Sequence, residues 1–407
     1  MDVLLTDGNE RAALAAARSL VRAGFDVGVA ATRGVTLAGV SRGVRRLRLS
    51  TDPFADPDAY AAEVGCLAQR LGTRVLLPVT DASVEAVLDY CPRRPSSVAL
   101  PFPDLETYRK ASDKAAMLEY ARAAGLVVPE TLVLAAAGAE LPQSDFFPAV
   151  AKPHRSVVSW SAYGDGERSN SNNGAKNNHG RRHLAVRFVD TPDQCRAVLD
   201  ALPVSAFPVL LQRRIRGAGE GLFVLRWNGQ IVAQFAHRRL REKPPEGGVS
   251  VYRESIAPSA SLVDAGRRLL EALNWHGVAM IECKRDPETG RHVFMEVNGR
   301  LWGSLQLAID AGVDFPTLLV RCAMGESVRP CHAYRVGVRS RWFWGDVDQL
   351  YLRIRSGHGS RWSAVRDFLS AFLQGGRSEI WRWKDPAPFA VETLQWLGIV
   401  TPDTPGR

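Results

Sequence analysis

The stretch FMEVNGRLWGS, residues 294–304, places polar side chains at regular intervals in an otherwise apolar segment. Its polar residues Glu296, Asn298 and Arg300 recur at every second position. Because residues two apart in a strand point to the same face, one face of the predicted strand carries a carboxylate, an amide and a guanidinium. A lone buried carboxylate is costly, so we expect this row to face a partner group or an ion.

A second apolar strand, GVAMIECKRD (277–286), is joined to HVFMEVN (292–298) by the turn-rich segment DPETG. Such a short connection predicts an antiparallel hairpin, in which Glu282 can lie across from Glu296. Two facing carboxylates repel each other unless a cation lies between them. Together with the Asn298 carbonyl they are hard oxygen donors that suit Mg²⁺, which fills its remaining positions with water and substrate phosphates.

A structural alternative is a Glu–Arg–Lys network on a wet strand, with Lys284 and Arg300 pairing the two acids. That alternative leaves unexplained why carboxylates interrupt strands that are otherwise apolar. We therefore predict a metal site on the hairpin, with Arg300 supplying a planar donor fork for a phosphate oxygen.

Two lysines are candidates for contacts with phosphates. Lys152 ends the apolar strand FPAVAKP (147–153), and Pro153 prevents a regular ladder from continuing, so the ammonium is expected to project into open space. Lys114 opens a predicted helix, capped by Ser112 or Asp113, near the positive end of its dipole. Taken alone, each of these lysines is more simply interpreted as a surface residue.

A nucleotide-binding site is predicted in LLQRRIRGAGEGLFV, residues 210–224. Apolar residues there run into a polar hinge, whose backbone edge can read an adenine, and Glu220 between two glycines can accept ribose hydroxyls. The hinge consists of Gln212, Arg213, Arg214 and Ile215.

The chain divides into regions of different pattern. Residues 1–103 alternate strands with helices, which predicts an α/β domain with a doubly wound parallel sheet. Its segment TDGNERA is not GxGxxG, so a dinucleotide site is not expected there. From about residue 146, antiparallel hairpins with helices on one face predict an α+β domain. The Asn- and Gly-rich stretch 165–183 predicts a mobile loop, because it cannot bury enough apolar surface to fold alone.

In this order the motifs resemble the ATP-grasp superfamily, which includes carbamoyl-phosphate synthetase, biotin carboxylase and D-alanine–D-alanine ligase. The resemblance covers about residues 1–325 and is nearest to the carboxylate–amine ligase and carbamoyl-phosphate synthetase-like branch. It implies a pre-ATP-grasp domain (1–103), an N-lobe with a mobile loop at 156–183 (104–205), a C-lobe with the metal site (206–330) and a C-terminal extension (331–407).

The resemblance also implies roles for individual residues. ATP phosphates would contact Lys114 and Lys152, adenine would lie against the hinge at 212–215, and the ribose would bind Glu220. Glu282, Glu296 and Asn298 would hold Mg²⁺, with two ions in the site. Mn²⁺ is an alternative metal. Arg300 and Lys152 would act in catalysis. The chain departs from the family at the long Asn-rich loop and at Gln212, where a glutamate is frequent.

The implied activity is that of an ATP-dependent ligase, which activates a carboxylate as an acyl phosphate and joins it to an amine. Loop 156–183 would close to exclude water from the acyl phosphate. The substrate carboxylate needs a cationic binding site, and the segments QFAHRRLRE and SVYRES offer candidate residues. The plainer explanation of these basic residues is that they are surface charges. These candidates are His237, Arg238, Arg239 and Arg253.

Composition and charge limit the partners and the cellular location that the sequence predicts. The 407 residues carry a net charge of +9, but no nucleic-acid-binding motif accompanies the scattered basic residues, so we expect no nucleic-acid partner. No apolar run approaches the ~20 residues of a membrane span, the N-terminus lacks a basic signal-peptide region, and the six cysteines show no CxxC pairing. A cytoplasmic protein with reduced cysteines is expected, and dimers are common in the family that it resembles.

Six of the ten tryptophans lie after residue 340. The simpler interpretation is a helical, Trp-rich extension with an aromatic core. The alternative is a basic amphipathic helix on a membrane surface, in an ATP-binding pseudoenzyme or docking protein that uses this segment to reach a partner.

Overall fold

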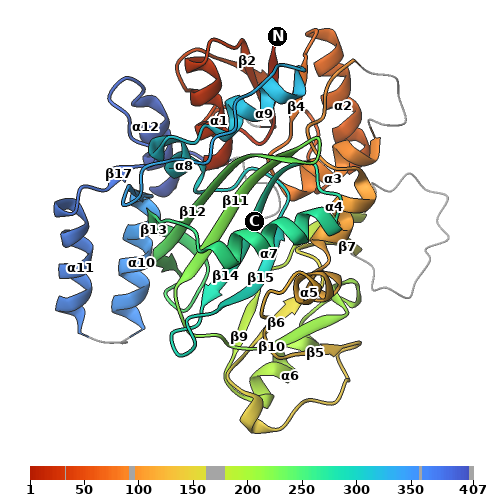
Figure 1. Ribbon diagram of the computed structural model, residues 1–407, viewed down its shortest axis with the longest axis vertical. Helices are drawn as coiled ribbons and strands as arrows, with labels where there is room; N and C mark the ends of the chain where they lie inside the picture. The colour runs from red at the N-terminus through yellow and green to blue at the C-terminus, as the bar shows by residue number, and fades with distance from the viewer. Residues whose placement is uncertain (33, 91–96, 162–178, 357–359, 403–407) are drawn as a thin grey trace.

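The N-terminal region forms a four-stranded parallel sheet (Figure 1). The computed structural model describes residues 1–407 apart from 33, 91–96, 162–178, 357–359 and 403–407. The sheet has the order β3-β2-β1-β4, and its strands are β1 Val3–Leu5, β2 Val27–Ala31, β3 Val44–Arg48 and β4 Val75–Leu77. Every residue of β1, β2 and β4 is buried, as in parallel sheets covered on both faces.

Helices cover both faces of this sheet, as the alternating pattern predicts. Val3 and Leu5 of β1 share a core with α1 (Arg11–Arg22), whereas Leu4 packs with α2 (Pro57–Arg70) on the other face. Helix α3 (Asp81–Tyr90) follows β4 directly. The sequence analysis missed β3, because three arginines hide its short apolar pattern. Such charged residues suit an exposed edge strand.

Residues 104–125 form two helices, and the predicted helix start at Lys114 is confirmed, with Asp113 as its N-cap. Helix α4 (Leu105–Ser112) ends at Asp113, whose backbone is extended, and α5 (Lys114–Ala123) begins after it. The Asp113 carboxylate accepts hydrogen bonds from the backbone amides of Ala115 at 2.9 Å and Ala116 at 3.1 Å. Asp113 is therefore the N-cap that fixes Lys114 at the first turn of α5.

The small lobe is an antiparallel sheet in the order β5-β10-β6-β9. Its strands are β5 Thr131–Leu134, β6 Ala149–Pro153, β9 Arg187–Val189 and β10 Val209–Arg213, and helix α6 (Pro192–Asp200) packs on it. The expected loop 156–183 is partly wrong, because β7 (Val157–Ser161) and β8 (His179–His183) pair as an antiparallel hairpin. The apolar start of VVSWS and the pairing of its backbone groups with HGRRH account for the order of the two ends. The rest of that expectation, 162–178, lies outside the described residues.

The large sheet has seven strands in the order β15-β14-β11-β12-β13-β16-β17. They are β11 Gly219–Trp227, β12 Gln230–Lys243, β13 Val249–Ser255, β14 Gly277–Arg285, β15 His292–Asn298, β16 Arg339–Arg341 and β17 Arg377–Ser378. Helix α7 (Ala260–Ala272) lies across one face (Figure 1). There Gly266 lies so close to Leu222 and Ile281 that a Cβ would stand 2.7 Å from the Leu222 side chain. The opposite face of the central strands carries the polar residues His237 and Glu282 at one end and the buried Phe223 and Phe235 beside them.

The N-terminal domain is joined to the large sheet by helix packing. Helix α1 contacts α8 (Leu305–Ala311) and α9 (Phe315–Ala323), which follow β15 in the chain. Between them, the Ser19 hydroxyl donates to the Asp314 carboxylate at 2.6 Å. The carboxyl ends of β1 and β4 are thereby brought near the end of β15.

The C-terminal segment is helical and Trp-rich, as expected, but it also adds β16 and β17 to the large sheet. Its helices are α10 Phe343–Arg355, α11 Arg361–Leu373 and α12 Ala387–Trp396. Trp342 and Phe389 pack against the main core, whereas Trp344 stacks on the 43% exposed Trp396 with ring centroids 4.1 Å apart. By contrast, Trp362 and Trp383 are 83% and 87% exposed.

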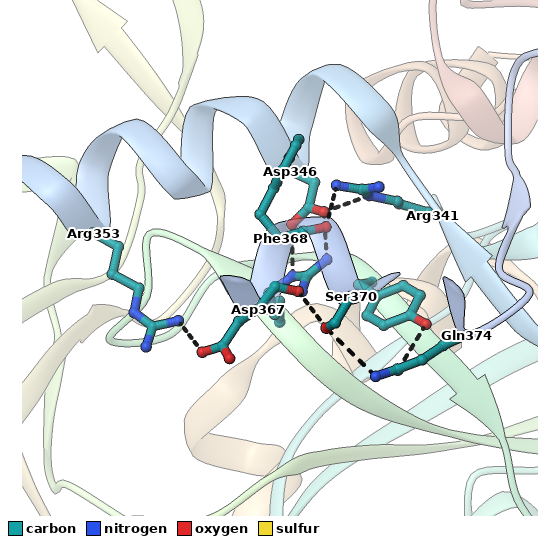
Figure 2. A network of polar contacts seen from close by, with 9 residues as sticks. Arg341, Asp346, Arg353, Asp367, Phe368, Ser370 and Gln374 are labelled. Atoms are coloured by element: carbon teal, nitrogen blue, oxygen red, sulfur yellow. Dashed lines mark hydrogen bonds and ion pairs between the residues drawn. The ribbon is translucent and has the colours of Figure 1, made fainter. Parts of the chain in front are cut away.

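Figure 2 shows the polar network that fastens α10 and α11 to the sheet. Asp346, fully buried in α10, accepts from Arg341 of β16 at 2.5 Å and from Arg241 of β12 at 2.7 Å. Arg353 of α10 donates to Asp367 of α11 at 3.0 Å. Over the part of the chain that the structure describes, no helix is both long enough and apolar enough to cross a membrane.

Candidate active site

The two acids of the predicted hairpin face each other. Glu282 of β14 is the register partner of Glu296 of β15, and the ladder is irregular directly after Glu282. The Asn298 amide donates to Glu296 at 3.0 Å, which joins the third predicted ligand to the pair. Burial and the charge of Glu296 raise the pKa of Glu282, although Arg239 opposes the shift. The predicted hairpin and its register are therefore confirmed.

The two predicted lysines reach the same place from other elements. Lys152 ends β6, and burial lowers its pKa to about 8, against the opposing charge of Glu296. Burial pushes the pKa of Glu296 up, but Lys114, Asn298 and Lys152 outweigh that effect and bring it below its usual value. The Lys114 ammonium donates to the Ser156 hydroxyl at 2.8 Å. Three separate elements thus bring two ammonium groups to one carboxylate.

A pocket opens beside this cluster, between the N-terminal domain, the small lobe and β15. It reaches from Asp81 at the start of α3 to Lys114 at the start of α5. Its lining comprises Asp81, Glu85, Tyr108, Ala111, Ser112, Lys114, Met117, Arg155, Ser156, Val157, Glu296, Val297 and Asn298.

Arg300 does not continue the row of Glu296 and Asn298, so that part of the strand prediction is wrong. Strand β15 ends at Asn298, and the alternation of faces ends with it. Arg300 instead forms an ion pair with Asp81, with Nε and Oδ2 2.8 Å apart, and the Tyr108 hydroxyl donates to the same carboxylate at 2.9 Å. Burial opposes ionisation of Asp81, yet Arg300 lowers its pKa. Sequence reasoning missed Asp81, although its place at the end of the strand RVLLPVTD was a usable signal.

The predicted hinge begins at the end of β10, with Gln212 and Arg213, and continues into the connection to β11 with Arg214 and Ile215. The Gln212 amide donates to Thr131 at 3.1 Å, while its buried carbonyl oxygen has no hydrogen-bond partner within the described ranges. The Ile215 carbonyl accepts from Lys284 at 3.3 Å. The two arginines between them turn outward: Arg213 pairs with Glu130 at 2.8 Å, and Arg214 donates to the Glu246 carbonyl at 3.2 Å.

Glu220 lies on the opposite face of the sheet from the acid pair. Its neighbour Gly221 is the register partner of Glu282, so the side chain of Glu220 points the other way. There the Glu220 carboxylate meets the His292 imidazole at 2.8 Å and is only 4% exposed. The predicted ribose contact is not brought to the site in this structure, because one residue of register decides the face.

The residues predicted to bind the substrate carboxylate have different surroundings. Arg253 is fully buried, and its two terminal nitrogens already have partners in the Ser250 carbonyl and Glu379. Arg238 is paired with Glu254 at 2.8 Å. Arg239 lies 2.5 Å from Glu282 and 3.0 Å from Glu242.

His237 lies on the same face as Glu282, across Gly221 of β11. It is 1% exposed, and neither ring nitrogen has a partner among the residues that the structure describes. Burial, and then the charges of Arg239 and Arg253, hold its pKa well below the ordinary range. The imidazole is therefore neutral near pH 7 and presents a donor and an acceptor.

The donor set fits a divalent cation that brings further ligands of its own. Two carboxylates and one amide converge, and burial together with the charge of Glu296 raises the pKa of Glu282. Outside the undescribed segments, no group of three or more His, Cys, Asp or Glu side chains could hold a metal ion. Mg²⁺ suits such a sparse site, because it keeps several waters and binds substrate phosphates.

Comparison with known proteins identifies the fold that carries this site. A family model described as "ATP-grasp in the biosynthetic pathway with Ter operon" matches residues 208–343. The structure resembles biotin carboxylase from Campylobacter jejuni, solved as a β-γ-ATP complex, with a TM-score of 0.60 and 15% identity over 83% of this chain and 74% of that one. The chain has the ATP-grasp fold. No curated protein sequence matches it.

Other proteins of the ATP-grasp fold are equally distant in sequence. The L-amino acid ligase from Bacillus licheniformis has a TM-score of 0.58 and 15% identity, over 81% of this chain and 75% of that one. The biotin carboxylase domain of 2-oxoglutarate carboxylase from Hydrogenobacter thermophilus, solved with MgADP and bicarbonate, has a TM-score of 0.58 and 14% identity, over 83% and 73%. The ATP-grasp family match includes β11 to β15, and hence both acids.

Proposed function

We propose that the protein is an ATP-dependent ligase that activates a carboxylate as an acyl phosphate and joins it to an amine. The observation that carries the proposal is the convergence of the Glu282–Glu296 pair with Lys114 and Lys152 in one site. The solved neighbours include an L-amino acid ligase and carboxylases bound to nucleotide, which supports this reaction class.

The two lysines are proposed to hold the phosphates of ATP. Lys152 is buried and its pKa is lowered to about 8, so a polyphosphate beside it favours its charged form. Adenine would lie against the hinge, where the unpartnered carbonyl oxygen of Gln212 is available to an exocyclic amine. We assign no ribose contact to Glu220, since His292 holds it on the other face.

Glu282, Glu296 and Asn298 would hold Mg²⁺, with two ions or Mn²⁺ as variants of the same site. When bound, the ion would neutralise charge on the phosphates. Arg300 is proposed to stabilise the transferring phosphoryl group. Its guanidinium is fixed by Asp81, which lines the pocket. His237 is proposed to offer a neutral donor or acceptor to the substrate.

The proposed reaction has two steps. A carboxylate oxygen attacks the γ-phosphorus, a new O–P bond forms, and the bond to the ADP oxygen breaks. An amine nitrogen then attacks the acyl carbon, phosphate leaves with its bridging oxygen, and the amine proton passes to solvent. Positioning and charge neutralisation supply most of the acceleration in phosphoryl transfer.

The test is ADP release by the purified protein, supplied with ATP, Mg²⁺ and a panel of amino acids and small carboxylates, with mass spectrometry of the product. We expect stimulated ADP release and an amide product. Glu296→Gln should reduce turnover by roughly 100-fold, because loss of a metal ligand removes several kcal/mol of charge stabilisation. The matched control is Glu288→Gln, an exposed acid in the turn of the same hairpin. Turnover equal in wild type and Glu296→Gln would refute the metal assignment.

A further inference from the structure

The basic residues of β12 and β13 differ in the acids that neutralise them. Four have partners that take no part in the proposed site: Arg238 with Glu254, Arg241 with Asp346, Lys243 with Asp348, and Arg253 with Glu379. Arg239 alone among the basic residues of these two fully described strands pairs with one of the two proposed metal ligands, Glu282. Arg239 and a cation would therefore compete for the charge of that carboxylate.

The path of the Arg239 side chain is built into the sheet. From β12 it crosses β11 at Gly219 and reaches Glu282 on β14. A Cβ at Gly219 would stand 2.7 Å from the Arg239 Cδ and 3.0 Å from a Glu242 oxygen, so only glycine leaves room for this crossing. Both ends are enclosed: the side chains of Arg239 and Glu282 are 12% and 17% exposed.

The hydrogen bonds of Arg239 are incomplete. One terminal nitrogen donates to Glu242 at 3.0 Å and to the Gly248 carbonyl at 3.1 Å, and the other meets Glu282 at 2.5 Å. The buried Nε has no partner in the described part of the chain. Removal of Glu282 would leave Nε and one terminal nitrogen side by side, which is the fork that binds a carboxylate or phosphoryl group through two hydrogen bonds.

We propose that Arg239 is a metal-gated anchor for the oxyanion of the substrate. Without metal, Glu282 occupies the guanidinium and the anchor is closed. With a divalent cation on Glu282 and Glu296, Arg239 is released, and the cluster gains positive charge that an oxyanion neutralises. The identity of that oxyanion rests on the proposed function. It is first the substrate carboxylate and then the phosphoryl group that becomes bound to it. By linkage, metal and anion each raise the affinity for the other.

The test measures binding without turnover, using inorganic phosphate and Mn²⁺ as probes. Glu282→Gln removes the charge that closes the anchor, so calorimetry should show phosphate binding about tenfold tighter than in wild type, both without metal. The double variant Glu282→Gln/Arg239→Gln should lose this gain. Absence of the gain, or its persistence in the double variant, overturns the proposal.

A second measurement approaches the same exchange from the metal side. Arg239→Gln removes the competitor for Glu282, so electron paramagnetic resonance should show Mn²⁺ binding severalfold tighter than in wild type. Arg238→Gln, one residue along and paired with Glu254 instead, is the control and should leave Mn²⁺ affinity unchanged. Unchanged or weaker Mn²⁺ binding in Arg239→Gln overturns the proposal.

The measurements remain decisive if one variant misfolds. Circular dichroism checks each protein, and if Arg239→Gln or the double variant is unfolded, the phosphate affinity of Glu282→Gln decides alone. None of these measurements requires ATP or a ligase substrate. A panel that yields no ligase product would therefore refute the proposed function and leave the Arg239 exchange standing.

Discussion

Arg239 and Arg253 are register partners on neighbouring strands, yet their surroundings give them different roles. Residue type and strand period predict that such residues share a face with Glu282. They cannot predict which acid each arginine meets, because Glu379 lies 126 residues away from Arg253 in the chain. The facing of Glu282 and Glu296 was predictable, since it depends only on a short hairpin. The pairing of Arg300 with Asp81 was not, because it depends on how two domains pack.

Glu392 gives the stability of the protein a predictable pH dependence. It is 7% exposed, one oxygen accepts from the Trp342 indole at 2.6 Å, and the other has no partner within the described ranges. Burial raises its pKa to about 7, although Trp342 and Arg11 oppose the shift. Between pH 4.5 and 7 the unfolded chain loses this proton first, so stability falls as the pH rises through that window.

Glu392→Gln keeps the acceptor for Trp342 and removes the titration. We expect the variant to be more stable than wild type at pH 8, on the order of 2 kcal/mol, with the difference shrinking towards pH 5. Melting temperatures measured from pH 5 to pH 8 check this. A difference that is constant across the range would show that Glu392 does not titrate there.

At the scale of elements, capping explains where residues 104–125 break into two helices. Residue types predict a cap at Ser112 or Asp113, and the extended backbone of Asp113 ends one helix and starts the next. Short strands were the least predictable elements: β3, β16 and β17 carry mostly charged or polar residues and are defined by their neighbours. The long strands of the hairpin kept their period and were predictable.

Asp113→Ala should destabilise the protein by about 1 kcal/mol and also weaken ATP binding, because it frees the first turn that holds Lys114. Asp104→Ala is the matched control, since Asp104 caps α4 through Thr107 at 2.8 Å. It should cost similar stability in urea denaturation and leave ATP affinity unchanged. Equal ATP affinity in both variants would contradict a role for the α5 start in nucleotide binding.

At the scale of the whole molecule, Glu379 joins three regions. It accepts from Arg11 of the N-terminal domain at 2.7 Å and from Arg253 of the large sheet, while itself following β17 in the C-terminal segment. The segment predicted as an appended extension is thus part of the core of the molecule. Sequence patterns cannot reveal this, because the contact is between residues hundreds of positions apart.

Glu379→Ala should destabilise the protein by about 3–5 kcal/mol, because it leaves two guanidinium groups without their shared acid. Glu271→Ala, which removes an exposed partner of Arg267, should cost less than about 1 kcal/mol. Chemical denaturation of both variants measures the difference. Similar small losses would mean that the buried triad does not hold the three regions together.

The acid pair and the two lysines are proposed to form one binding site for Mg²⁺ and ATP. Calorimetric titration of ATP into wild type and Lys152→Ala, each with and without Mg²⁺, tests it most directly. We predict Mg²⁺-dependent ATP binding in wild type and affinity lower by one to two orders of magnitude in Lys152→Ala, as expected for loss of a hydrogen bond between charged groups. ATP binding that is equal in the two proteins and indifferent to Mg²⁺ would contradict the account.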